Sequence, residues 1–149
     1  MSRSNVFGIH KADARKIKKV VGKTKVNVTI TSPPYFDLKD YGVDNQIGFG
    51  QDYKDYLKDI RKVFKAVCEI THDDGSLWII IDTFRKNGEV IPLPFDLSSE
   101  LRKVGWKLQE IIIWEKDKTL PWVHQGQMRN IFEYILVYRG LNPCLEYNF

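Results

Sequence analysis

Residues 53–70 constrain the fold more than any other part of the sequence. Apolar residues recur in this segment every three or four positions, and Lys, Arg and Asp fill the positions between them, which is the pattern of an amphipathic helix. Two short apolar runs, residues 26–30 and 76–82, lie on either side and predict buried strands. A strand, a long helix and a second strand in this order favour a parallel crossover unit.

The remaining segments continue this alternation of strands and helices. The same patterns predict helices over residues 12–21 and 94–104. They also predict strands over residues 5–9, 106–114 and 131–138. A loop over residues 36–51, with glycines at 42, 48 and 50, precedes the long helix. A loop of this length in a compact domain is usually functional or mobile. The expected fold class is α/β, with helices covering a largely parallel sheet.

Composition indicates one globular domain. The chain has 149 residues, 43% of them hydrophobic and 28% charged. Its two cysteines, Cys68 and Cys144, are too few for a disulfide framework or a zinc site, and we expect Cys68 to be a buried thiol. No apolar run approaches the roughly 20 residues of a membrane span, and no signal region opens the chain. We therefore expect a cytoplasmic protein without a membrane partner.

Positive charge is concentrated near the N-terminus. Residues 1–25 hold eight Lys/Arg and one acidic residue, whereas the remainder holds 15 Lys/Arg and 18 acidic residues. Such a segment can contact nucleic-acid phosphates, or it can be the solvated face of a helix beside the core. Both interpretations stay open.

A rigid loop follows the strand predicted for residues 26–30, and its residues are Thr31, Ser32, Pro33, Pro34 and Tyr35. Ligands of open α/β sheets bind beyond the carboxyl ends of the strands, where this loop is expected to lie. Proline fixes the backbone and has no N–H donor, so its carbonyl oxygen is left to serve as an acceptor. A Ser oxygen and a Pro carbonyl can accept both protons of an exocyclic amino group, while the Tyr ring stacks on a planar base.

Two aligned acceptors would change the reactivity of such an amino group. An aromatic amino group is a weak nucleophile because its lone pair is delocalised into the ring. Acceptors that favour a pyramidal nitrogen localise this lone pair and prepare the nitrogen to attack an electrophilic methyl group. The alternative is that the string is only a tight turn between a strand and a loop.

The same string resembles motif IV of the amino-methyltransferases of DNA, which transfer a methyl group from S-adenosylmethionine to the exocyclic nitrogen of cytosine or adenine. The resemblance continues collinearly over most of the chain, in residues 35–42, 46–48, 74–78, Asp82, 105–114, Lys116 and 130–138. It implies half of a Rossmann-like methyltransferase sheet, with mostly parallel strands, a C-terminal antiparallel strand and helices on both faces. It also implies DNA as the substrate.

The resemblance assigns roles to individual residues. The catalytic residues would be Ser32, Pro33, Pro34 and Tyr35, and the residues in contact with the substrate would be Phe36, Tyr41 and Lys116. Asp82 would lie near the site, and Trp122 would line its mouth beside Lys116. The target base would have to be flipped out of the duplex. Because Ser at position 32 is commoner in cytosine-modifying members, we expect cytosine rather than adenine.

Cofactor binding is less fully represented. The resemblance assigns Asp13 and Thr31 to S-adenosylmethionine, although Ala12 stands where the family has a glycine. Asp13 is equally well explained as the N-cap of the following helix. The glycine-rich loop that closes around the methionine part of the cofactor is not found. Residues 48–50, Gly-Phe-Gly, lie inside the long loop and predict only a turn.

The order of the motifs predicts one half of an enzyme. About thirty residues precede Ser32, too few for a cofactor-binding βαβ unit. The chain therefore resembles the catalytic half of an enzyme of permuted order, without the cofactor half and the target-recognition region. A subunit of a split enzyme, a truncated product and a fragment all fit. We expect the outer edge of strand 26–30 to be covered by a complementary chain or a second copy of this one.

A non-catalytic protein is the main alternative. In that case the basic N-terminus and the rings of Tyr35, Phe36 and Tyr41 would form a nucleic-acid-binding or assembly surface on an inactive methyltransferase-like fold. A methyltransferase acting on RNA or a small molecule is disfavoured, because such enzymes place their cofactor motifs before the catalytic loop.

Overall fold

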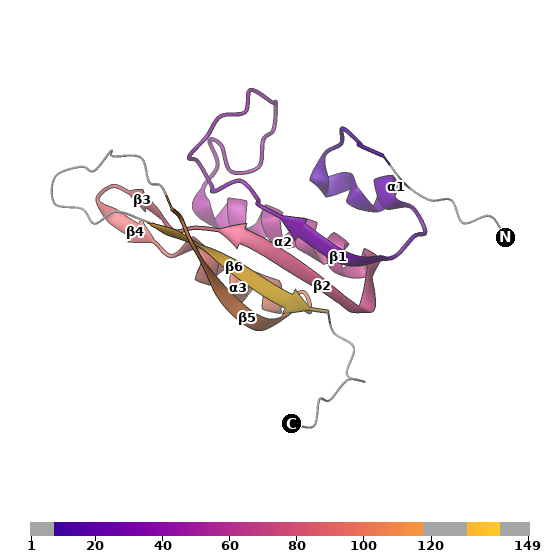
Figure 1. The fold of residues 1–149 in the computed structure, drawn as a ribbon. Helices are drawn as coiled ribbons and strands as arrows, with labels where there is room; N and C mark the ends of the chain where they lie inside the picture. The colour runs from indigo at the N-terminus through magenta and orange to yellow at the C-terminus, as the bar shows by residue number, and fades with distance from the viewer. Residues whose placement is uncertain (1–7, 118–130, 141–149) are drawn as a thin grey trace.

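The computed structural model describes residues 8–117 and 131–140. Its elements follow in the order η1 (Ala14–Lys16), α1 (Ile17–Val21), β1 (Val26–Thr31), α2 (Tyr53–Ile70), β2 (Thr71–Ile81), β3 (Phe84–Lys86), β4 (Glu89–Ile91), α3 (Leu93–Arg102), β5 (Lys107–Glu115) and β6 (Phe132–Arg139) (Figure 1). Within the described part of the chain, no helix is both long enough and apolar enough to cross a membrane.

Four strands form the main sheet in the order β1-β2-β6-β5. β1 pairs with β2 in parallel, whereas β6 is antiparallel to both of its neighbours. β1, β2 and β5 therefore point the same way, and only the C-terminal strand β6 runs against them. This confirms the α/β class and the expected sheet with one antiparallel strand.

α2 and α3 both lie on one face of the sheet (Figure 1). The side chains of Leu77, Ile79 and Ile81 point to this face and are completely buried. The expectation of helices on both faces is wrong for the described residues, which place both long helices on the same side. The crossovers β1-α2-β2 and β2-α3-β5 move across the sheet in the same direction. Right-handed crossovers that move in one direction place their helices on one side.

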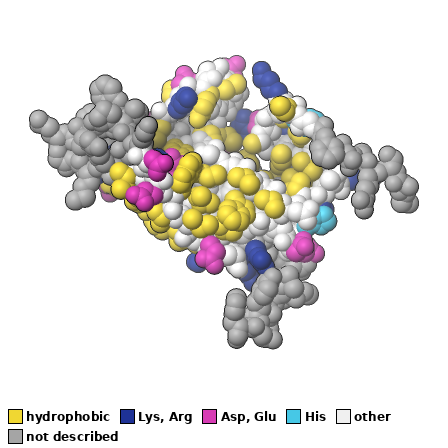
Figure 2. Space-filling model, viewed as in Figure 1, with side chains coloured by type: hydrophobic (Ala, Val, Ile, Leu, Met, Phe, Trp, Pro, Cys, Tyr) yellow, Lys and Arg dark blue, Asp and Glu magenta, His cyan; other side chains and the backbone are white. Residues whose placement is uncertain are grey.

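The opposite face carries apolar side chains with no helix over them in the described residues (Figure 2). Val28 and Ile30 of β1 are 53% and 68% exposed, and Ile112 of β5 is 40% exposed. Their strand partners place them on the same face as Trp78 and Ile80 of β2, which are partly buried. We call these five residues the open face of the sheet.

α2 has the bounds that its periodicity predicts, Tyr53–Ile70. It begins at Asp52, whose side chain accepts a hydrogen bond from the backbone N–H of Lys54 at 2.9 Å and so caps the helix. Its covered stripe consists of Tyr56, Ile60, Val63, Phe64, Val67 and Ile70. The carbonyl of Phe64 accepts a hydrogen bond from the indole of Trp106 at 3.0 Å, which fixes α2 against the beginning of β5.

Three further features of the described residues differ from the sequence-based expectations. β2 begins at Thr71, ahead of the predicted position 76, and the expected turn at 73–75 is a bulge in which two residues of β1 correspond to five of β2. A short hairpin of β3 and β4 was not predicted. Cys68 is only partly buried, although it packs against the core.

The N-terminal strand expected over residues 5–9 is not seen where the chain is described. Gly8 and Ile9 belong to no strand, and Ile9 is fully exposed. Residues 5–7 of that expectation lie outside the described residues, as do Cys144 and Trp122.

Candidate active site

The carboxyl ends of three strands and the beginning of a fourth lie together at one end of the sheet. β1, β2 and β5 end there at Thr31, Ile81 and Glu115, and β6 begins there at Phe132 because it runs in the opposite direction. Ser32, Asp82, Lys116 and Glu133, which follow or lie within these ends, are thereby brought to one side of the molecule although they are far apart in the sequence. This is the end at which open α/β sheets bind their ligands.

A pocket of about 240 Å³ lies directly beyond β1. Its lining residues are Ser32, Pro34, Tyr35, Phe36, Leu38, Lys39 and Tyr41. Tyr41 is 56% exposed, and the ammonium group of Lys39 lies 5.1 Å from the centroid of its ring. The volume is smaller than the roughly 300 Å³ at which pockets for drug-sized ligands begin, and aromatic rings line it from two parts of the loop.

The two prolines have different surroundings. The carbonyl of Pro34 accepts a hydrogen bond from the hydroxyl of Tyr56 at 2.6 Å, so that α2 holds the loop from below. Burial raises the pKa of Tyr56 well above its usual range, which keeps this hydroxyl protonated as a donor. Pro33 is buried, while Ser32 is exposed. Ser32 lines the pocket and Pro33 does not, while the Pro34 carbonyl is already bound to Tyr56.

Tyr35 is half-buried, and its hydroxyl points away from the solvent. The hydroxyl oxygen lies 3.3 Å from Oε2 of Glu133 and 3.5 Å from the carbonyl oxygen of Ile80. Burial raises the pKa of Tyr35 to about 12; a hydrogen bond with Ser32 opposes this shift, and the negative charges of Glu133 and Asp82 add to it. The neutral phenol is thus the form present near pH 7.

Phe36 requires a correction. Its ring is only 2% exposed and lies in an aromatic cluster, 5.1 Å from the ring centroid of Tyr53, 5.4 Å from that of Tyr56 and 5.8 Å from that of Phe84. The left-handed backbone of Phe36, with a φ of 56°, turns the side chain inwards. Although the residue lines the pocket, its ring belongs to the core and cannot stack on a base.

Lys116 is positioned by both its backbone and its side chain. Its backbone N–H donates to the carbonyl of Ile131 at 2.7 Å, and its Nζ lies 2.7 Å from Oε1 of Glu133. Lys116 is therefore close to the end of the sheet that carries the pocket, but it does not line the pocket. Its direct partner is a carboxylate of this chain.

Gln46, to which the resemblance assigns no role, fixes the backbone of Tyr41. Oε1 of Gln46 accepts from the backbone N–H of Tyr41 at 2.7 Å, and Nε2 of Gln46 donates to the carbonyl of Lys39 at 2.6 Å. The expected turn at residues 48–50 is present, with the N–H of Gln51 donating to the carbonyl of Gly48 at 3.4 Å. These contacts give the long loop a defined shape beside the pocket.

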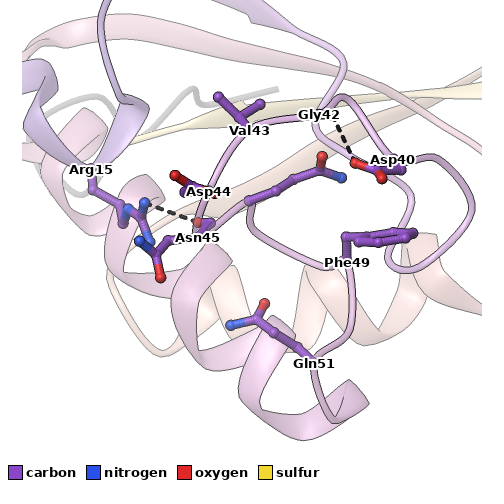
Figure 3. Close-up of a pocket in the computed structure, with 9 residues that line it drawn as sticks. Arg15, Asp40, Gly42, Val43, Asp44, Asn45, Phe49 and Gln51 are labelled. Atoms are coloured by element: carbon purple, nitrogen blue, oxygen red, sulfur yellow. Dashed lines mark hydrogen bonds between the residues drawn. The ribbon is translucent and has the colours of Figure 1, made fainter.

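A second, wider cavity of about 680 Å³ lies between η1 and the long loop (Figure 3). Figure 3 shows Arg15 reaching from η1 to the loop, where its guanidinium donates to the carbonyl of Asn45 at 3.1 Å. The same guanidinium pairs with Asp13 at 2.8 Å. Asp40, Asp44 and Gln51 also line this space, so its wall is mainly polar.

Asp13 and Thr31 do not by themselves make a cofactor site. Asp13 is the N-cap of η1, and its carboxylate accepts from the backbone N–H of Arg15 at 2.9 Å and from Nε of the same residue. These hydrogen bonds with Arg15 hold the pKa of Asp13 below its usual value. Thr31 is the half-buried last residue of β1. Within the described residues no glycine-rich loop follows a strand, so the residues present do not enclose S-adenosylmethionine.

Two curated relatives resemble the chain over much of its length. The Type II methyltransferase M.MwoI of Methanothermobacter wolfeii is 32% identical over 117 residues, which cover 76% of this chain and 18% of the relative. The Type II methyltransferase M.SmaI of Serratia marcescens is 29% identical over 154 aligned residues, which cover 84% of this chain and 53% of the relative. The chain thus spans about half, or less, of these relatives.

Solved structures agree with the fold. TTHA0409 of Thermus thermophilus, solved in complex with S-adenosyl-L-methionine, is 27% identical with a TM-score of 0.65, and the match covers 87% of this chain and 51% of that one. The cytosine-N4-specific PvuII DNA methyltransferase, at 19% identity and a TM-score of 0.60, shares the fold over 78% of this chain and 43% of its own. The profile of N6 and N4 methyltransferases, described as DNA methylase, matches residues 26–143. This chain therefore belongs to the DNA methylase family of N6 and N4 amino-methyltransferases.

Proposed function

We propose that this chain is the base-binding part of an S-adenosylmethionine-dependent DNA methyltransferase that modifies the amino group of cytosine in preference to adenine. The pocket of about 240 Å³ beyond β1, with Ser32, Tyr35 and Tyr41 in its wall, is the observation that carries the proposal. An open pocket with aromatic walls suits a single base that has left the duplex. Serine at position 32 favours cytosine through the family resemblance.

The residues of this chain would bind the base and prepare its amino group. The hydroxyl oxygen of Ser32 and the carbonyl of Pro33 would each accept one N–H. The Tyr56 hydroxyl holds their loop in place by donating to the carbonyl of Pro34 at 2.6 Å. Fixed acceptors need no rearrangement when the amino nitrogen becomes pyramidal, so they lower the barrier to attack. S-adenosylmethionine supplies the methyl group.

A complementary polypeptide would carry most of the cofactor site. The match covers only 53% of M.SmaI and 51% of TTHA0409, so each of these proteins has a further part of comparable size. β1 is an edge strand of the main sheet, and Val28 and Ile30 on it are more than half exposed. An exposed apolar edge strand is a template for pairing with another strand. A second copy of this chain is the other candidate to cover it.

Methyl transfer tests the catalytic role. Radiolabelled S-adenosylmethionine and DNA would be incubated with this chain, with a polypeptide that carries the cofactor-binding half, and with both together. We expect label in DNA only when both are present, and its loss in Tyr35→Ala, because the stacking ring is removed. Phe95→Ala is the matched control, since Phe95 is a 48% exposed aromatic residue on α3 that does not line the pocket. Transfer that persists in Tyr35→Ala would contradict the assignment.

The role of β1 as the strand that pairs with a complementary chain is tested separately. Ile30→Lys places a charge on the exposed edge strand and is expected to prevent complementation without unfolding the chain. Val90→Lys is the control, because Val90 is 44% exposed on β4, outside the main sheet. Complementation that survives Ile30→Lys, or a chain that binds S-adenosylmethionine tightly alone, would refute the split organisation. DNA binding without transfer in any combination would favour the non-catalytic alternative.

A further inference from the structure

The hydroxyl of Tyr35 lies between two acceptors on neighbouring strands. Oε2 of Glu133 on β6 is 3.3 Å away, and the carbonyl of Ile80 on β2 is 3.5 Å away. A neutral phenol has one proton and can donate to one of these acceptors at a time. The carboxylate is the stronger acceptor, because hydrogen bonds to charged groups are about twice as strong as those between neutral groups.

Glu133 is itself held in place. Its other oxygen, Oε1, lies 2.7 Å from Nζ of Lys116, and the two side chains are 21% and 32% exposed. The backbone N–H of Lys116 donates to the carbonyl of Ile131, and Glu133 pairs with Trp114 in the β5–β6 ladder. The carboxylate therefore has little freedom, because β6, which carries Glu133, is paired with β5, and Lys116 follows directly after β5.

The two carboxylate oxygens of Glu133 have different partners, which indicates that the ion pair does more than stabilise the fold. Partly exposed ion pairs contribute only about 0–1 kcal/mol to stability. Here one oxygen of Glu133 faces a lysine and the other faces the Tyr35 phenol, so the ion pair orients the acceptor of a pocket residue. Lys116 also balances the negative charge that Glu133 brings close to Tyr35, on which the buried Asp82 acts as well.

We propose that Glu133, oriented by Lys116, is a positioning residue that fixes the Tyr35 ring in the base pocket. This inference rests on the proposed function, because it concerns the ring on which the base would stack. The hydroxyl lies on the long axis of the ring, so its hydrogen bond fixes the direction of that axis and the place of the ring. A stacking partner that is fixed in advance loses less freedom when the base arrives.

Titration of Tyr35 tests the contact in the chain alone. Incorporation of 3-fluorotyrosine, whose phenol is more acidic, brings the titration into a range in which the fold persists. Tyr35→Phe assigns the Tyr35 signal among the seven tyrosines in the ¹⁹F NMR spectrum. Glu133→Gln should lower the pKa of residue 35, because the negative charge of Glu133 is removed while Ser32 and Asp82, the other groups that act on it, remain. Glu115→Gln, at the exposed end of β5, should leave it unchanged.

A double-mutant cycle in the complemented enzyme tests the positioning role. Glu133→Gln and Tyr35→Phe should each lower kcat by roughly three- to tenfold, the range expected for one hydrogen bond. If Glu133 acts through the Tyr35 hydroxyl, the double variant should be no slower than either single variant. If Glu133 has a purely structural role, Glu133→Gln should lower kcat by the same factor whether residue 35 is Tyr or Phe. That result would overturn the proposal.

The two experiments separate the two proposals. If Glu133→Gln leaves the pKa of Tyr35 unchanged, the positioning role is refuted whether or not methyl transfer is observed. If the titration behaves as expected but no combination transfers a methyl group, the contact between Glu133 and Tyr35 stands and the proposed function fails.

Discussion

The two faces of the strand β2 differ in how far they are buried, although their side chains are alike. On β2, Leu77, Ile79 and Ile81 are completely buried beneath the helices, whereas Trp78 and Ile80 at the alternate positions are only partly buried. A sheet with one solvated face normally alternates apolar and polar residues, whereas a strand covered on both faces is apolar throughout. The composition of β2 is thus that of a sheet with both faces covered, and the described residues cover one.

The largest expected effect is the difference in the free energy of unfolding between a substitution on the face covered by the helices and one on the open face. Ile79→Ala should lower the free energy of unfolding by about 3 kcal/mol, because it leaves a cavity in the packed core. Ile30→Ala, at a position that is 68% exposed, should change it by less than about 1 kcal/mol. Chemical denaturation of both variants measures the difference. Equal losses would mean that the open face is already packed in the isolated chain.

The attachment of β1 is the second point at which the comparison can be tested. A Cβ atom at Gly75 would lie 2.5 Å from Cγ2 of Thr71 and 2.8 Å from the carbonyl oxygen of Asn27 on β1. Gly75→Ala should therefore push β1 away from the bulge of β2 and cost about 2 kcal/mol. Hydrogen exchange should show the loss of protection mainly in β1. Uniform loss across the sheet would contradict this local origin.

Alkaline pH compares the tyrosine of the pocket, Tyr35, with a tyrosine of the covered core, Tyr56. Burial raises the pKa of Tyr35 to about 12 and that of Tyr56, in the covered core, still further. A pKa that is higher in the folded state gives stability that is complete below the unfolded value of about 10 and is lost as the pH rises through the folded value. Tyr56→Phe should flatten the pH dependence of unfolding above pH 10 more than Tyr35→Phe. The reverse order would show that Tyr35 is the more deeply buried group.

The smallest effect concerns α1. It packs against α2, and Lys18 pairs with Glu69 across this contact, with side chains 58% and 43% exposed. Lys18→Met should change the free energy of unfolding by no more than about 0.5 kcal/mol, because exposed ion pairs are weak. A change above 1 kcal/mol in thermal or chemical denaturation would show that the basic N-terminal segment is part of the core's support rather than a solvated helix face.

The sequence patterns predicted the long elements better than the short ones. α2 could be predicted to the residue because its periodicity extends over 18 residues and a capping aspartate precedes it. The β3–β4 hairpin carries an Asn87-Gly88 turn signal, with both residues at positive φ, but strands of three residues each are too short to show alternation. The single covered face could not be predicted from periodicity, since it depends on the order of the strands.

The candidate site shows the same limit. A loop at the end of a strand was predictable from Ser32 to Tyr35, because the two prolines act on the local backbone. The buried ring of Phe36 was not, because it follows from one left-handed backbone angle of 56°. The pairing of Lys116 with Glu133 depends on the register of β5 against β6, which no local pattern in either strand determines.

The position of β6 has a consequence for how the protein forms. β6 comes last among the described strands, yet it lies between β2 and β5 inside the sheet. During synthesis, the inner edges of β2 and β5 therefore wait unpaired until residues 132–139 have left the ribosome. Contacts between such distant segments form slowly. Because the same strand delivers Glu133 to the Tyr35 hydroxyl, the contact between Glu133 and Tyr35 forms only when the sheet closes, and a chain that has not finished folding lacks it.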